Sequence, residues 1–136
     1  MAYSNGDIRK TDGGLDSTLA LLVAVKTFKI LNLPLQNIYC YTMPGFATTK
    51  RTKSNAIELA EAMGVSIETI DITKGSAQNL ADISHGGKTQ DLTFQNVRAR
   101  YRTMTLMNKA NLIKGFVLGT GDLSEIALGW NTFTGD

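Results

Sequence analysis

The sequence has few of the residues that build disulfide frameworks or metal centres. Its one cysteine, Cys40, has no second thiol to pair with, so an internal disulfide is excluded. Cys40 lies within an apolar segment, and we expect it to be a buried small hydrophobe rather than a nucleophile. The one histidine, His85, lies in a glycine loop without a cysteine or an acidic residue at ligand spacing. We therefore expect His85 to be exposed and to bind no metal.

Strong net charge and long apolar runs are also absent. Fourteen Lys and Arg residues stand against 12 acidic ones, and a net charge of +2 is too small to indicate nucleic-acid binding. The longest apolar run, 19–25, is far too short to span a membrane, and the first ten residues lack the apolar core of a signal peptide. The composition predicts a cytoplasmic protein without a nucleic-acid or membrane partner.

Apolar periodicity divides the chain into alternating helices and strands. Helices are predicted over 16–31, 48–63, 77–83, 93–113 and 123–129, and strands over 37–43, 65–72 and 115–119. Because strands separated by helices need crossover connections, the fold class is α/β, with a parallel sheet and helices on both faces. Residues 1–11 lack such periodicity and are expected to form a flexible arm before a domain over 12–136.

A glycine loop precedes the first predicted helix. Gly13 and Gly14 allow a tight turn, so that several backbone N–H groups can converge on one anion at the helix N-terminus. Ser17 can donate its hydroxyl to phosphate, whereas Asp16 has the wrong charge for phosphate and suits a bridging Mg²⁺ instead. The same residues can equally form an ordinary glycine turn, with Asp16 or Ser17 as helix cap. The loop alone leaves both interpretations open.

Four segments together resemble a known family. GGLDS, at 13–17, is similar to the SGGxDS loop of the ATP pyrophosphatases. GGLDSTLALLVAVK, TMPGFATTKRTKSNA, FQNVRARYRT and GTGDLSEIALGW resemble successive blocks of NAD synthetase, and Leu123-Ser124 after Asp122 resembles its glutamine-dependent branch. The resemblance covers residues 13–136. It implies an adenine-nucleotide alpha-hydrolase-like core, present as a partial synthetase domain without the glutaminase domain.

The resemblance implies roles for individual residues. ATP contacts fall on Gly13, Gly14, Leu15, Asp16, Ser17, Met43 and Thr120. Contacts to deamido-NAD fall on Asn96, Arg100, Glu125, Trp130, Asn131, Thr132 and Phe133, and Mg²⁺ ligands on Asp16 and Glu125. No separate catalytic residue is implied. Two copies of the chain are expected to pair through this domain, as synthetase domains of the family commonly do.

The residues also allow structural roles for several of these positions. Met43 can be a core methionine, Trp130 a core aromatic, and Glu125 the third residue of a capping box that begins at Asp122. On the long helix two pairs lie four residues apart and point to roughly opposite sides. The family match assigns the pair Asn96 and Arg100 to the ligand. The pair Arg98 and Arg102 is predicted to form a solvated face.

The implied reaction has two steps. The carboxylate of deamido-NAD attacks the α-phosphate of ATP and releases pyrophosphate, and ammonia then displaces AMP to give NAD. Rival functions are another ATP pyrophosphatase, such as a GMP synthetase or a tRNA-thiolating enzyme, and a non-catalytic nucleotide-binding remnant.

Three departures from the family favour the remnant. Asp12 replaces the loop serine, and two unit charges ~4 Å apart repel by roughly 4 kcal/mol at an effective dielectric constant of ~20. Residues 7–11 are mostly polar where the family has an apolar strand, and the sequence ends before later binding elements of the family. Turnover by this chain is therefore not expected.

Overall fold

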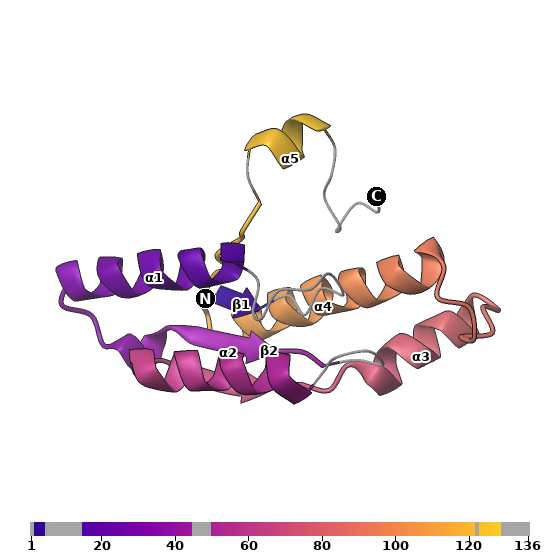
Figure 1. Ribbon diagram of the computed structural model, residues 1–136, viewed down its shortest axis with the longest axis horizontal. Coiled ribbons are helices and arrows are strands. Elements are labelled where there is room, and N and C mark those ends of the chain that lie inside the picture. The colour runs from indigo at the N-terminus through magenta and orange to yellow at the C-terminus, as the bar shows by residue number, and fades with distance from the viewer. Residues whose placement is uncertain (1, 5–14, 45–49, 122, 129–136) are drawn as a thin grey trace.

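The computed structural model describes residues 2–4, 15–44, 50–121 and 123–128. Figure 1 shows the arrangement of the helices and strands. In chain order they are β1 (Ala2–Ser4), α1 (Leu15–Ile30), the short 3₁₀ helix η1 (Leu35–Asn37), β2 (Tyr39–Thr42), α2 (Lys50–Met63), β3 (Ser66–Thr69), α3 (Thr73–Asp82), α4 (Leu92–Leu112) and α5 (Leu123–Leu128). None of the described helices is both long and apolar enough to cross a membrane.

The strands form a parallel sheet in the order β1-β2-β3. Tyr3 is opposite Tyr41 in the first pair, and Cys40 is opposite Ile67 in the second. The sheet corrects one prediction, because Ala2–Ser4 belongs to a strand rather than to an arm. Three residues are too few to show a periodic pattern, and backbone bonds to β2 are enough to hold them. A strand therefore does precede the glycine loop, although residues 7–11 themselves lie outside the described part.

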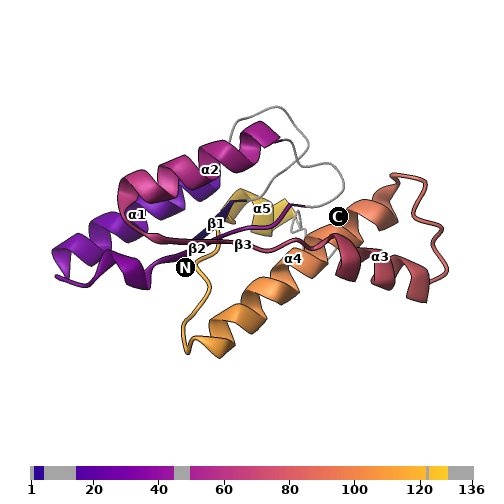
Figure 2. The same cartoon turned by 90° about the horizontal axis from the view of Figure 1, so that it is seen from below.

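Helices cover both faces of the sheet, as predicted. Successive side chains of β2 point to opposite faces. Cys40 lies in a buried cluster with side chains of α1 and α2, including Leu21, Val25 and Ala60. Tyr41 lies in a second cluster, with Leu106 of α4. Figure 2 shows the same layers, with α1 and α2 on one side of the strands and α4 on the other. The α/β class with a parallel sheet is confirmed.

One predicted strand is absent from the described structure, and one predicted helix begins at a different residue. Residues 115–119 pair with no strand in the described structure, although Val117 and Leu118 pack against different clusters, as successive strand residues would. This segment passes beside β1 (Figures 1 and 2), but the described sheet contains only the strands β1, β2 and β3. Helix α3 begins at Thr73 rather than residue 77, because the Asp71 carboxylate accepts a 2.8 Å hydrogen bond from the Thr73 N–H and supports the first turn.

Candidate functional site

Helix α4 lies antiparallel to β2, and its contacts show this residue by residue. Lys109 Nζ lies 2.7 Å from a carboxylate oxygen of Glu68 in β3, beside the Tyr41 ring. One turn earlier, Leu106 packs with Tyr41 and Met43. One turn earlier again, Arg102 Nε donates a 3.3 Å hydrogen bond to the Met43 carbonyl, just past the end of β2. The N-terminal half of α4 therefore extends beyond the carboxyl end of β2.

The burial of Arg98 and Arg102 overturns the prediction that they form a solvated face. Arg98 is 3% exposed and Arg102 is 7% exposed, so both lie on the inward side of α4. Charged residues are rarely buried, which is why both arginines were predicted to be exposed to solvent. The helical repeat indicates burial instead, because both arginines lie at four-residue intervals with Phe94, Leu106 and Ala110, which are buried.

The predicted phosphate loop is described only from the start of α1. Gly13 and Gly14 lie outside the described residues, whereas Leu15, Asp16 and Ser17 form the first turn of the helix. Asp16 is exposed and Ser17 is buried. In Figure 1, α1 begins at the end of the sheet toward which β2 points. The start of α1 and the N-terminal half of α4 thus lie at the same edge of the sheet.

Two more predicted ATP contacts lie within the described residues. Met43 follows β2 and is 3% exposed, with its side chain in the cluster of Tyr41, Ile72 and Leu106. That packing accounts for Met43 as a core residue, and its adenine contact stays a prediction. Thr120 is half-buried and follows the segment that runs beside β1.

The predicted deamido-NAD contacts are described in part. Asn96 is half-buried and Arg100 is exposed, both in the N-terminal half of α4. Glu125 lies in α5, but its side chain and residues Trp130, Asn131, Thr132 and Phe133 are outside the described part. The structure thus leaves the role of Asn96 and Arg100 as a prediction and does not test the others.

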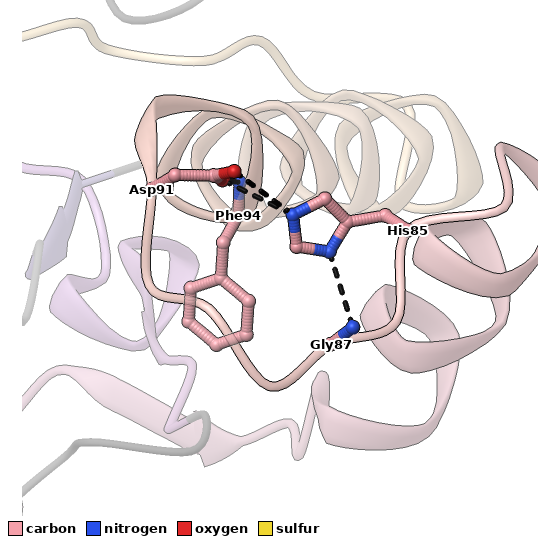
Figure 3. Close-up of polar contacts among 4 residues, drawn as sticks. All are labelled: His85, Gly87, Asp91 and Phe94. Carbon is pink, nitrogen blue, oxygen red and sulfur yellow. Dashed lines mark hydrogen bonds and ion pairs between the residues drawn. The ribbon is translucent and has the colours of Figure 1, made fainter.

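His85 is half-buried and has an acidic partner, contrary to the prediction that it is exposed. Its Nε2 lies 3.1 Å from Asp91 Oδ2, while its Nδ1 accepts a 3.1 Å hydrogen bond from the Gly87 N–H (Figure 3). Nε2 therefore carries the proton toward Asp91. Asp91 also caps α4 by accepting from the Phe94 N–H at 2.9 Å, and these hydrogen bonds lower its pKa. Both ring nitrogens are occupied, so His85 braces the α3–α4 loop.

Cys40 behaves as predicted. It is 8% exposed, and burial raises the pKa of its thiol to about 11. A thiol with so high a pKa is protonated at neutral pH and is a poor nucleophile.

A shallow depression between β3 and α4 is lined by residues such as Ile70 and Met104 and contains none of the predicted site residues.

Comparison with known proteins identifies the family. The sequence profile described as NAD synthase matches residues 5–136, nearly the whole chain. The chain belongs to the NAD synthase family. The match includes the four segments on which the sequence resemblance rests, as well as the start of α1 and all of α4.

Curated relatives within the NAD synthase family are glutamine-dependent NAD(+) synthetases. That of Mycobacterium bovis is 49% identical over 125 residues, which are 89% of this chain and 18% of the relative. That of Rhodobacter capsulatus is 30% identical over 126 residues, 91% of this chain and 22% of the relative. The chain thus spans about a fifth of the length of these relatives.

Solved structures of similar proteins share the fold. A glutamine-dependent NAD+ synthetase from Acinetobacter baumannii, in complex with adenosine diphosphate, matches with a TM-score of 0.77 and 29% identity over 90% of this chain and 22% of its own. An NMN synthetase from Francisella tularensis matches with a TM-score of 0.73 and 28% identity over 90% of this chain and 48% of its own.

Proposed function

We propose that this chain supplies the nucleotide-binding core of an NAD-forming ligase. The observation that carries the proposal is the family match over residues 5–136. The fold supports it, because the start of α1, the end of β2 and the N-terminal half of α4 lie at the carboxyl edge of a parallel sheet. Ligands of such sheets bind at this edge. The family match favours this function over a GMP synthetase or a tRNA-thiolating enzyme.

In this proposal ATP binds where α1 begins. The glycine loop and the N-terminus of α1 would present N–H groups to the phosphates, and the Ser17 hydroxyl would donate to one of them. Asn96 and Arg100 would hold deamido-NAD from α4. The substrate carboxylate is already ionised and needs no general base, so the protein would act by positioning the two nucleotides and neutralising charge.

Mg²⁺ belongs to the proposal as an ion bound together with ATP. Among the described residues no group of three or more His, Cys, Asp or Glu side chains could hold a metal. A nucleotide-bound Mg²⁺ needs only one or two protein carboxylates, because phosphate oxygens and water complete its shell. The exposed Asp16 carboxylate fits that requirement, with Glu125 as the second proposed ligand. The bound ion would neutralise phosphate charge during transfer.

We also propose that two copies of the chain pair and that the protein is cytoplasmic. Pairing draws support from α1, which is apolar on two sides. Its inner side is in the core, while Leu19 and Val23 are 61% and 54% exposed. Leu19 and Val23 lie four residues apart and therefore face the same way, and exposed apolar patches of this kind mark interaction surfaces. Sedimentation of the chain would show a dimer that Leu19→Lys converts to a monomer. An unchanged monomer in both proteins would contradict pairing.

Asp12 supports a second candidate function, which is nucleotide binding without turnover. An acidic residue in place of the loop serine would repel phosphate and remove a hydroxyl donor. NAD formation from ATP, Mg²⁺, deamido-NAD and ammonia should be measured for this chain and for Asp12→Ser. Turnover in either protein supports the ligase, and turnover only in Asp12→Ser locates the defect at residue 12. ATP binding without NAD in both proteins supports the second candidate.

A further inference from the structure

Arg98 is a buried cation that the roles described so far do not use. It is 3% exposed, its guanidinium lies 5.6 Å from the centroid of the Phe94 ring, and its buried Nε has no hydrogen-bond partner. Burial lowers its pKa from the ordinary value, which shows that the surroundings disfavour the charge. Buried charged groups are usually paired, so an arginine of this kind needs an anion.

Lys109, on the same helix, is a cation whose charge is balanced by a carboxylate. Its Nζ lies 5.4 Å from the centroid of the Tyr41 ring, almost the same ring contact that Arg98 makes with Phe94. Lys109 also has a carboxylate, Glu68, at 2.7 Å. Arg98 has no such ion pair among the described residues, although it is much the more buried of the two. Arg98 therefore differs from Lys109 in lacking a nearby anion, and not in its contact with an aromatic ring.

The position of Arg98 indicates where the anion would come from. Arg102 already touches the carbonyl of Met43 at the end of β2. Arg98 lies one turn further toward the N-terminus of α4, which is about 6 Å along the helix. Since α4 and β2 are antiparallel, this places Arg98 beyond the carboxyl end of the strand, in the region where ligands of parallel α/β sheets bind.

We propose that Arg98 binds a phosphate group of a nucleotide seated at this edge of the sheet. The proposal rests on the proposed nucleotide site and adds to it a residue from the inward side of α4, opposite Asn96 and Arg100. A guanidinium matches phosphate geometry because its donors form a planar fork. The aromatic ring of Phe94 lies against the guanidinium, and the phosphate would supply the missing negative charge.

The test compares Arg98→Met with Lys109→Met by thermal melting. Methionine keeps the length and much of the volume of both side chains while it removes the charge. Each protein is melted alone and with inorganic pyrophosphate, ATP or deamido-NAD. We expect Arg98→Met to melt no lower than the unchanged chain when alone. Arg98→Met should lose the ligand-induced rise in melting temperature, with a Kd at least about tenfold weaker. Lys109→Met should keep that rise.

The ligands distinguish the source of the phosphate. A loss confined to ATP and pyrophosphate assigns Arg98 to the triphosphate, and a loss confined to deamido-NAD assigns it to the dinucleotide. Arg98→Lys, which keeps the charge without the fork, should bind with intermediate affinity and provides the test should Arg98→Met fail to fold.

Two outcomes overturn the inference. In one, Arg98→Met, or Arg98→Lys in its place, shows the same ligand-induced rise as the unchanged chain, so that Arg98 is only structural. In the other, no phosphate compound raises the melting temperature of the unchanged chain, and then the proposed nucleotide site fails as well. Failure of the inference alone is therefore distinct from failure of the proposed function.

Discussion

Gly75 in α3 offers a test of how closely α3 packs on α4. A Cβ added at Gly75 would overlap the hydroxyl and Cζ of Tyr101 and would lie 2.7 Å from its Cε2. In a helix, alanine is favoured over glycine by about 1 kcal/mol. Overpacking costs about 1–3 kcal/mol, so Gly75→Ala should lower the free energy of unfolding by up to roughly 2 kcal/mol. Without the overlap, the same change should stabilise the protein.

A double-mutant cycle measures the overlap directly. Gly75→Ala is made in the unchanged chain and in a Tyr101→Ala background, and urea unfolding gives the free energy of each protein. We expect the sign to reverse, with Gly75→Ala destabilising in the first background and stabilising by about 1 kcal/mol in the second. Stabilisation in both backgrounds would refute the close packing of α3 against the Tyr101 ring.

Two further predictions concern single residues. Burial raises the Cys40 pKa from 9.0 to about 11, so the folded state holds this proton more tightly and stability is lost as pH rises through that window. Cys40 should contribute about 2–3 kcal/mol of the loss in urea unfolding, so the loss should be smaller by this amount in Cys40→Ala; an unchanged pH profile in that variant would contradict it. Lys114 follows Ile113, the C-cap of α4, and takes a left-handed conformation at φ 54°, so Lys114→Gly should stabilise the protein by about 0.5–1 kcal/mol. Gly64→Ala, at φ 70°, should destabilise by a similar amount, and equal melting temperatures for all three proteins would count against both expectations.

The sequence predicted best those elements whose pattern is long or ends in a distinct cap. Helices α1 and α4 begin and end within one residue of their predicted limits. Helix α2 ends at Met63, as predicted, because Gly64 takes the positive φ expected of a residue after a helix. Strand β1 was missed because three residues have no period, and its existence depends on backbone bonds to a distant segment.

The buried state of Cys40 was predictable from its apolar neighbours. The ligand role of Asn96 and Arg100 rests on a motif in one helix and stays a prediction. The burial of Arg98 depends on the packing of α4 against the sheet, which outweighs the general preference of arginine for solvent. The His85–Asp91 contact requires the α3–α4 loop to fold back over six residues, which no local pattern indicates.

The central claim is that this chain binds ATP at the carboxyl edge of its sheet, and calorimetric titration of ATP with Mg²⁺ tests it most directly. We predict saturable binding of one ATP per chain, competition by inorganic pyrophosphate, and loss of binding in Gly14→Asp, which would fill the phosphate loop with a charged side chain. Absence of binding, or binding that neither pyrophosphate nor Gly14→Asp affects, would contradict the claim.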